Sequence, residues 1–337
     1  MSEVRIAVDA MGGDDAPHSP VEGAVDAVRK SGIHVILVGK EPEIDAELRR
    51  LEVPADVGRR LEVVHAEQVV EMDDPPIAPL RRKRQSSIRI GAELVRDGRA
   101  RALVSAGNTG AAMVAAKTVI GVAEGVTRPA LATTVPTESG RAVLLDVGAN
   151  VDTSPEQLRE FAVMGSLFSE EIVGTPNPRV GLLSIGEEQG KGNEAVKKAF
   201  ENIERAGVNF IGNVEGSDIF KGTADVVVCD GFVGNVVLKS AEALAEMMIN
   251  MIRDEIMKSP LTRLGGGLAK PALLRFKSRT AYDEFGGAPL LGINGGCFIA
   301  HGRSNPKAIQ NAIIKAHSFA VADVDHRITR RLSLIHI

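Results

Sequence analysis

Short apolar runs alternate with amphipathic helical patterns along most of the 337 residues. The runs are rich in Val, Leu and Ile and lack regular polar alternation, which is typical of strands buried on both faces. The segments between them, such as 154–172 and 193–207, repeat apolar residues at helical spacing. This alternation predicts a three-layer α/β/α fold in which helices cover both faces of a mostly parallel sheet. The runs occupy residues 4–8, 34–39, 61–66, 102–107, 142–148, 179–186, 208–213 and 224–230.

The chain is expected to form one α/β domain over residues 1–330, because it shows neither an internal repeat nor a low-complexity linker. The proline-rich stretch 73–79 is too short to join two domains. A basic and apolar stretch at 256–282 is predicted to project from this domain. Residues 331–337 are predicted to be a tail left from cloning, with no role.

Composition disfavours several function classes. Aromatic residues make up 3% of the chain and Trp is absent, which argues against a surface that stacks nucleic-acid bases. The two cysteines, Cys229 and Cys297, form neither a metal-binding spacing nor a disulfide framework, which favours a reducing cytoplasm. Cys229 lies in an apolar run and is expected in the core. We expect neither a signal peptide nor a membrane-spanning segment. Walker, dinucleotide-binding, zinc and serine-hydrolase motifs are missing, so no metal or cofactor is expected.

Glycine and small polar residues follow six of the predicted strands. In open α/β sheets ligands bind outside the carboxyl ends of the strands, so these loops are expected to meet in one polar crevice. Glycine permits close backbone approach, and asparagine caps a following helix whose first N–H groups can bind an anion. Ordinary loop composition is the alternative for any single loop. The candidate substrate- and phosphate-binding residues are Asp9, Gly12, Gly13, Asp14, Asn108, Thr109, Gly110, Asp146, Asn150, Gly192, Asn193, Asn213, Glu215, Asp230 and Gly234.

Lys191 is the one lysine in these loops, and Gly190 and Gly192 flank it. A cation on a glycine loop suits a phosphate group or a developing oxyanion, and a solvated loop lysine is the alternative. Lys239, on the helix after the last of these loops, either assists or faces solvent. His301 is the one histidine at a plausible strand end, where a buried structural role is an equally good explanation.

The motifs in these loops are similar to those of one known family. They read "IAVDAMGGDDAP", "SAGNTGA", "RPALATTVPT", "LLDVGANVD", "GKGNE", "FIGNVEG" and "DGFVGNVVLKS". From Arg5 to about Arg327 the chain resembles the PlsX family, the acyl-ACP:phosphate acyltransferases of bacterial phospholipid synthesis. The resemblance implies a fold similar to isocitrate and isopropylmalate dehydrogenases and to phosphotransacetylases.

The resemblance also implies a reaction and its partners. An acyl group would pass from acyl carrier protein to inorganic phosphate, giving acyl phosphate for a downstream glycerol-phosphate acyltransferase. The lysine of "KGNE" and the asparagine of "GFVGN" would be catalytic, which here are Lys191 and Asn235. Family members form homodimers in the cytoplasm that sit reversibly on the membrane. One departure is Asp15, where many members have His, so a general-base histidine at that position does not apply here.

This chemistry agrees with the residues in the loops. Phosphate is itself the nucleophile and the carrier's thiolate leaves, so no protein nucleophile is required. The protein must bind a dianion, align it with the thioester and stabilise a tetrahedral oxyanion. Asp9 and Asp14 would orient neighbouring side chains.

The stretch 256–282 contains basic and apolar residues and no acid, within a chain of net charge −4. Such a mixture favours a peripheral contact with an anionic membrane surface, and a helical hairpin packed on a dimer partner is the alternative. Its basic residues are Lys258, Arg263, Lys270, Arg275, Lys277 and Arg279, and the predicted membrane-contacting residues are Leu261, Leu264, Leu268, Lys270 and Leu273.

A second basic stretch lies at 80–87, where Arg81, Arg82, Lys83 and Arg84 are consecutive. Acyl carrier proteins are acidic, so this stretch is a candidate docking patch, with a solvated helix start as the alternative.

Two other functions stay open at this stage. One is an NAD-dependent β-decarboxylating dehydrogenase on the same fold, which the scarcity of arginine in the strand-end loops disfavours. The other is a non-catalytic scaffold for lipid enzymes at the membrane.

Overall fold

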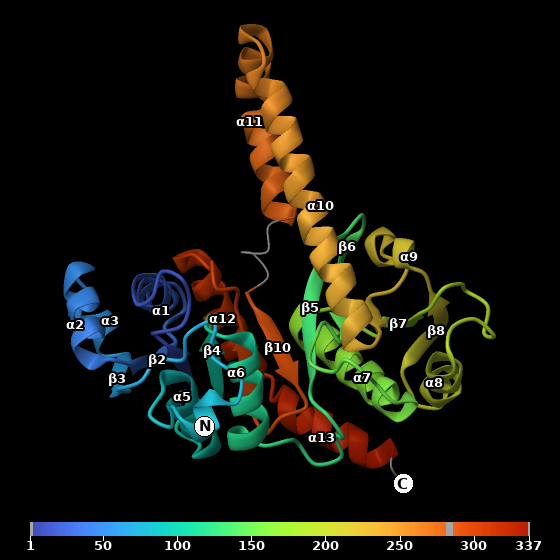
Figure 1. The fold of residues 1–337 in the computed structure, drawn as a ribbon, viewed down its shortest axis with the longest axis horizontal. Coiled ribbons are helices and arrows are strands. Elements are labelled where there is room, and N and C mark those ends of the chain that lie inside the picture. Colours follow the sequence, from blue (N-terminus) through green and yellow to red (C-terminus); the bar gives the residue numbers. More distant parts are fainter. Residues whose placement is uncertain (1–2, 281–285, 336–337) are drawn as a thin grey trace.

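The computed structural model describes residues 3–280 and 286–335, and these residues form one 11-stranded sheet (Figure 1). The strand order is β3-β2-β1-β4-β11-β10-β5-β6-β9-β7-β8. Each predicted apolar run overlaps a strand, and β5, β10 and β11 were not predicted. The strands are β1 (Arg5–Asp9), β2 (His34–Gly39), β3 (Leu61–His65), β4 (Ala102–Ser105), β5 (Ala130–Thr137), β6 (Gly140–Leu145), β7 (Arg179–Leu183), β8 (Asn209–Val214), β9 (Val226–Val228), β10 (Ala288–Leu291) and β11 (Gly296–Ile299).

The sheet consists of two parallel halves that run in opposite directions. Strands β1, β2, β3, β4 and β11 are mutually parallel, and so are β6, β7, β8 and β9. Between them, β10 is antiparallel to both β11 and β5, and β5 is antiparallel to β6. The mostly parallel sheet predicted from the sequence is therefore confirmed, with an antiparallel centre that reverses the strand direction.

Two hydrophobic clusters lie on the two faces of the sheet and complete the predicted three layers. Alternate residues of one strand enter different clusters: Ile6 and Val8 face one, and Ala7 faces the other. One cluster includes side chains of α1, α7, α8 and α12, and the other includes side chains of α5, α6 and α9. The helices are α1 (His18–Ser31), α2 (Glu41–Arg50), α3 (Ala55–Gly58), α4 (Ala78–Arg81), α5 (Ser87–Arg96), α6 (Thr109–Ala115), α7 (Pro155–Phe168), α8 (Glu194–Glu204), α9 (Gly216–Lys221), α10 (Gly231–Met257), α11 (Pro260–Thr280), α12 (Pro306–Val321) and α13 (Val324–Ile335), with π-helical turns at Ala116–Ile120 and Ser169–Val173.

Helices α10 and α11 form a hairpin that projects away from the two halves (Figure 1). The predicted projection, 256–282, covers the end of α10 and all of α11, while positions 281–282 lie outside the described residues. Leu261, Leu264 and Leu268 are 79%, 65% and 80% exposed, and Lys270 and Leu273 are also exposed. Among the described residues, no helix has both the length and the apolarity needed to cross a bilayer.

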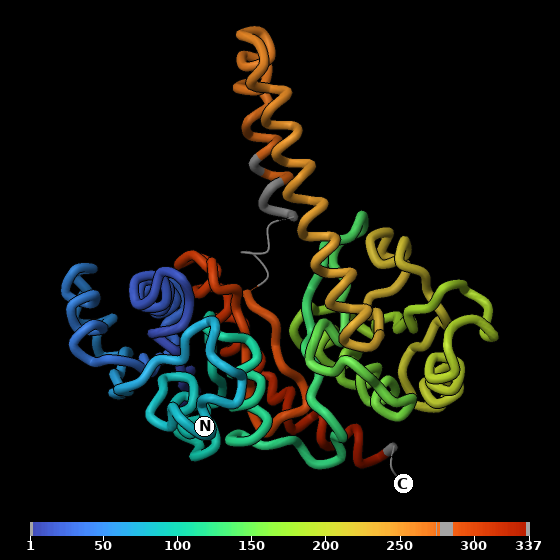
Figure 2. Tube along the Cα trace, in the orientation of Figure 1, coloured from blue at the N-terminus to red at the C-terminus, as the bar shows by residue number. Residues whose placement is uncertain are grey.

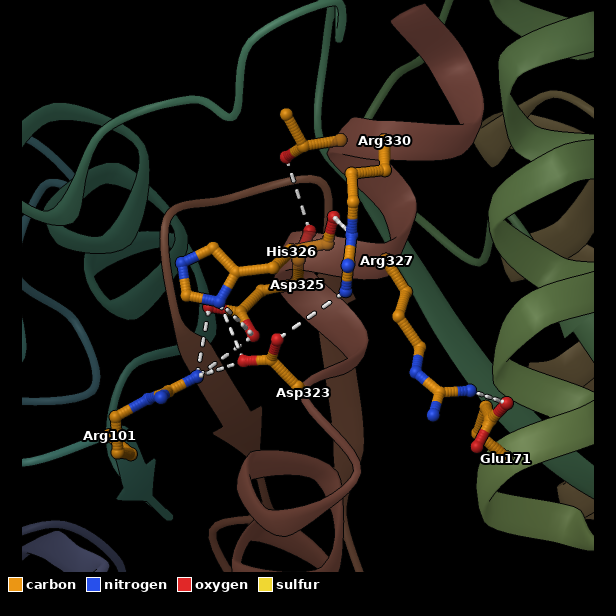
Figure 3. Close-up of polar contacts among 8 residues, drawn as sticks. Arg101, Glu171, Asp323, Asp325, His326, Arg327 and Arg330 are labelled. Atoms are coloured by element: carbon orange, nitrogen blue, oxygen red, sulfur yellow. Dashed lines mark hydrogen bonds and ion pairs between the residues drawn. The ribbon is translucent and has the colours of Figure 1, made fainter. Parts of the chain in front are cut away.

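Helix α13 fastens the two halves of the sheet to each other. It packs on α12 and α7, below both halves in the tube of Figure 2. At one side Arg101, which precedes β4, donates to Asp323 and Asp325 at 3.1 Å each (Figure 3). At the other side Arg327 pairs with Glu171, which follows α7. These contacts tie strands of one half to a helix of the other.

The C-terminal residues differ from the predicted tail. Residues 331–335 continue α13, and the side chain of Leu332 is 1% exposed within the hydrophobic cluster that contains α12. This part of the chain therefore contributes to the core.

Candidate functional site

The strand directions divide the predicted strand-end loops into two groups. One group follows β1, β4 and β11, and the other follows β6, β7, β8 and β9. The expectation of a single crevice assumed that all these strands run the same way, whereas the antiparallel centre of the sheet reverses the strand direction between the two groups. That all these loops meet in one crevice stays a prediction.

The loop after β1 is built around the buried carboxylate of Asp9. Its Oδ2 accepts a hydrogen bond from Ser105 Oγ at 2.7 Å, and its Oδ1 accepts one from the Met11 amide at 3.2 Å. A Cβ at Gly12 would lie 2.5 Å from Asp9 Oδ2, so the turn requires glycine. Burial raises the pKa of Asp9, and these hydrogen bonds oppose the rise. Asp9 thus holds the ends of β1 and β4 together.

The next residues connect this loop to the one after β11. Gly13 has a φ of 106°, which favours glycine, and the Asp14 amide donates to the Gly302 carbonyl at 2.8 Å. The Asp14 side chain is exposed. Asp15 accepts a hydrogen bond from Ser19 Oγ at 2.7 Å, so its carboxylate supports the start of α1.

Asn108 holds a loop in place and keeps no unused polar group. Its Oδ1 caps α6 by accepting from the Ala111 amide at 2.9 Å, and its Nδ2 donates to carbonyls of the 71–74 segment at 3.0–3.3 Å. Thr109 is exposed at the first position of α6. A Cβ at Gly110 would lie 2.8 Å from Pro76, so this glycine permits close packing of the proline-rich segment.

Asp146 organises the turn after β6 in the second group. Its Oδ1 accepts from the amides of Leu131, Gly148 and Ala149 at 3.0–3.1 Å, and its Oδ2 accepts from the amide and the Nδ2 of Asn150 at 2.8 and 2.9 Å. Burial raises the pKa of Asp146, while the hydrogen bonds oppose the rise. Every partner is an N–H donor, so the geometry suits the carboxylate form.

Helix α10 starts against this turn because two glycines allow it. A Cβ at Gly231 would lie 2.5 Å from the Asn150 carbonyl oxygen, and one at Gly234 would lie 1.9 Å from the Asp146 carbonyl oxygen. Asp230 caps the helix by accepting from the Val233 amide at 2.8 Å. This approach fixes the position of Asn235, whose side chain is exposed.

The amide of Asn235 lies beside the glycine turn after β6. A Cβ built on Gly148 would be 3.6 Å from Asn235 Oδ1. Within the described part of the chain, the Asn235 side chain makes no hydrogen bond. Its donor and acceptor are therefore available to a ligand.

The loop after β7 presents Lys191. The Lys191 amide donates to the Glu188 carbonyl at 2.9 Å, and Asn213 Nδ2 donates to the same carbonyl at 2.9 Å. The stem of Lys191 lies along Gly186, where a Cβ would be 3.0 Å from Lys191 Cγ. Its ammonium group is exposed and has no ion pair or hydrogen bond with any described residue. A fixed loop thus holds an available cation.

The flanking residues of this loop have structural roles. Gly192 has a φ of 95°, and Asn193 caps α8 by accepting from the Val196 amide at 2.9 Å. Glu215 occupies the corresponding position before α9, in a capping box with Asp218.

A cavity of about 920 Å³ opens between the loops after β6, β7 and β9. Its wall includes residues on both sides of the predicted motifs, and Lys191 and Asn235 each adjoin a lining segment. The sequence prediction missed the apolar residues that line the cavity. Their position directly beside the glycine and asparagine motifs could have indicated them. These residues include Val151, Leu182, Ile185, Ala195, Phe232 and Val233.

Helix α10 also connects the second group to the first. Burial lowers the pKa of His301, which follows β11, and the charges of Lys239 and Arg303 lower it further. Glu242 and Asp14 act in the opposite direction. The charges of Lys239 and Glu242 on α10 therefore act on the loops of the first group. Both side chains are exposed, and they form an ion pair with each other at 2.8 Å.

Both cysteines are buried, which disfavours the thiolate form that a nucleophile requires. Burial raises the pKa of Cys229 well above its usual value, and burial raises the pKa of Cys297 to about 12. The basic stretch at 80–87 is divided in function. Lys83 pairs with Asp74 and donates to the Val69 carbonyl at 2.7 Å, while Arg81, Arg82 and Arg84 are exposed.

Comparisons with known proteins identify the family. Residues 4–327 match the family model described as fatty acid synthesis protein. The chain is 52% identical to a phosphate acyltransferase of Pelotomaculum thermopropionicum, with 92% of this chain and 90% of that protein covered. It is 50% identical to a phosphate acyltransferase of Citrifermentans bemidjiense, with 98% and 93% covered.

Solved structures show the same fold at low sequence identity. A phosphotransacetylase from Streptococcus pyogenes aligns with a TM-score of 0.65 and 19% identity over 95% of this chain and 94% of that chain. The EutD phosphotransacetylase from Staphylococcus aureus aligns with a TM-score of 0.62 and 17% identity over 94% of each chain. From its sequence relatives, the chain belongs to the fatty acid synthesis protein family, whose similar members are phosphate acyltransferases, and it is an acyltransferase.

Proposed function

We propose that this enzyme transfers a fatty acyl group from the thioester of an acyl carrier protein to inorganic phosphate. The names of the relatives support phosphate as the acceptor. The observation that carries the proposal is the pairing of Lys191 and Asn235. Neither side chain makes a hydrogen bond with any described residue, and each lies next to a segment that lines one large cavity.

In the proposed reaction, a phosphate oxygen attacks the thioester carbonyl carbon and forms a tetrahedral intermediate. The carbon–sulfur bond then breaks, the thiolate leaves with its electron pair and takes a proton from water, and acyl phosphate remains. No protein nucleophile takes part, which fits the burial of Cys229, since that burial raises the pKa of its thiol. The dehydrogenase alternative gains no support from the sequence relatives.

Lys191 and Asn235 would have different roles. The ammonium group of Lys191 would bind the phosphate dianion and offset charge in the transition state. The Nδ2 group of Asn235 would donate a hydrogen bond to the oxyanion. The loop after β7 holds Lys191 and helix α10 holds Asn235, so little reorganisation is needed during the reaction.

The Lys191→Ala variant tests the proposal. We expect phosphate-dependent release of free carrier thiol to fall about 10²- to 10³-fold, as for loss of one preorganised oxyanion donor. Lys198→Ala is the matched control, because Lys198 is an exposed lysine on α8 in the same half of the protein. Activity of the Lys191 variant within twofold of wild type would contradict the assignment.

The exposed hairpin supports two further parts of the proposal. Leu244, Met247, Met248 and Met251 on α10 are each more than half exposed, so we propose that they pack on a second copy of the chain in a homodimer. The leucines of α11 would then contact an anionic membrane surface on the cytoplasmic side. There the acyl phosphate would be passed to a glycerol-phosphate acyltransferase.

The membrane contact has its own test. The double variant Leu264→Glu and Leu268→Glu is expected to lose co-sedimentation with phosphatidylglycerol vesicles, because each buried leucine contributes about 1.5–3 kcal/mol to insertion. Leu334→Glu is the control, since Leu334 is 74% exposed on α13, away from the hairpin. If the double variant dissociates into monomers and still binds vesicles, the α11 leucines belong to the dimer and the proposed membrane contact is wrong.

A further inference from the structure

The large cavity has an apolar wall that is open to water. Leu182 and Leu158 at its base are fully or almost fully buried. Towards its opening, Val151, Ile185 and Phe232 are 67%, 82% and 61% exposed. Apolar side chains that line a cavity and remain exposed mark a surface that a ligand or partner covers.

The electrostatics of the cavity disfavour phosphate as its occupant. Asp152 and Asp230 contribute carboxyl groups to the wall, and among its described lining residues there is no lysine or arginine. The N-terminus of α10 also points here, but the Asp230 carboxylate already accepts from the Val233 amide. A dianion would therefore meet like charge, and the cation of Lys191 lies just outside the wall.

Two polar groups in the wall lack partners. Ser184 Oγ and Thr153 Oγ1 are buried and make no hydrogen bond with any described residue. A ligand with a few polar groups and a long apolar part would satisfy these hydroxyls and cover the exposed apolar side chains. The volume, about 920 Å³, is at the upper end of the usual range for ligand cavities, about 300–1,000 Å³.

We propose that this cavity holds the acyl chain of the thioester donor, an inference that rests on the proposed function. The chain lies along the wall formed by β7, α8 and the first turn of α10. The thioester end lies at the edge next to Lys191 and Asn235: Lys191 precedes the lining residue Gly192, and Asn235 is two residues after the lining residue Val233 on α10. Phosphate then approaches from the side of Lys191, outside the apolar wall.

The proposal predicts selectivity for chain length. Each additional methylene buried in an apolar site increases binding by about fourfold, until the chain fills the site. Ala195 is the most direct position for a test, because it lies in the first turn of α8, lines the cavity and is only half-buried. A phenylalanine there would occupy part of the cavity.

The measured quantity is the ratio of kcat/KM for hexadecanoyl- and hexanoyl-carrier protein at saturating phosphate. We expect Ala195→Phe to lower this ratio at least tenfold, which corresponds to the loss of about two buried methylenes. Ala46→Phe adds the same volume at an exposed site on α2 and should leave the ratio unchanged. An unchanged ratio in Ala195→Phe, whether or not both rates fall, would overturn the proposal.

A binding measurement separates this inference from the proposed reaction. The chain contains no Trp, so Phe232→Trp places a single indole at the cavity opening. Titration with dodecanoate should shift its emission to shorter wavelength and saturate, and Ala195→Phe in the same background should weaken the binding. If the emission shows no saturable shift, the inference is refuted even if acyl transfer to phosphate is established. The same holds if the shift depends only on protein concentration, because it then reports the association of two copies. Saturable binding without phosphate-dependent thioester cleavage would instead refute the proposed reaction alone.

Discussion

Replacing Gly234 by alanine should impair activity although neither Lys191 nor Asn235 is itself replaced. The Cβ that Gly234→Ala adds would stand 1.9 Å from the Asp146 carbonyl oxygen and 2.9 Å from Cys229 Sγ. The first obstacle is backbone in a turn that is held by the Asp146 carboxylate, so it cannot rotate away as a flexible side chain would. The start of α10 must move instead.

The size of this movement follows from the contact distance. Real Cβ contacts are almost never shorter than 3.0 Å, so the helix start and the turn must separate by at least 3.0 − 1.9 = 1.1 Å. Asn235 is the next residue on α10 and moves with it. A misplacement of about 1 Å in a catalytic arrangement can cost about 10²-fold in rate, and overpacking of this kind costs about 1–3 kcal/mol in stability.

The assay is kcat/KM for phosphate-dependent acyl transfer, measured together with the urea midpoint of unfolding. We expect a loss of about 100-fold in Gly234→Ala at temperatures where the variant is fully folded. Gly58→Ala is the control, since no atom lies within 4 Å of a Cβ at that position. If Gly234→Ala keeps activity within threefold of wild type, the register of α10 against the Asp146 turn does not position the site.

Two further changes test the contacts that hold the loops and the halves of the sheet. Asp146→Asn should lower the free energy of unfolding in urea by about 2–4 kcal/mol, because the new NH₂ group faces N–H donors and leaves at least one buried donor unpaired. A change below about 1 kcal/mol would contradict this account. Arg101→Ala should cost about 1–3 kcal/mol, because Asp325, 6% exposed, loses the partner at 3.1 Å. Although burial acts in the opposite direction, hydrogen bonds from His326 and Arg101 lower the pKa of Asp323 below its ordinary value of 3.8. The stability that this carboxylate contributes is therefore complete above pH 3.8 and is lost as the pH falls through the lowered pKa. The difference in free energy of unfolding between wild type and Arg101→Ala should therefore shrink below about pH 4. A difference that stays constant with pH would show that Asp323 does not contribute.

The sequence predicted the strands that are buried on both faces and missed those in the antiparallel centre. Runs such as 34–39 and 224–230 are nearly continuous in Val, Leu and Ile, and β2 and β9 lie within them. Strand β5 contains threonines and Pro136, and β10 and β11 are four residues each, so their apolar pattern is weak. The missed strands reverse the sheet, and this is why the loops fall into two groups.

The asparagines show why residue type alone could not separate ligands from supports. Asn108 and Asn193 follow glycine or strand-end motifs just as Asn235 does, yet both cap helices with their side-chain oxygens. Capping was the correct physical expectation for asparagine at these positions. The available amide belongs to Asn235, which is the fifth residue of α10 and not its cap, a position that Asp230 occupies.

The buried carboxylates explain how a site with few charges can hold its shape. Asp9 and Asp146 each lie at a strand end, accept hydrogen bonds only from N–H or O–H groups, and force glycine on the neighbouring backbone at Gly12 and Gly231. Burial of each carboxylate opposes ionisation, so each must be held by several donors, and those donors are the turns themselves. The acids that the sequence suggested as ligands thus act on the backbone. Because Asp146 fixes the turn beside which Asn235 lies, the Asn235 amide can stay exposed and unpaired. The loop that carries Lys191 is held instead by the Glu188 carbonyl, which accepts from the Lys191 amide and from Asn213 Nδ2.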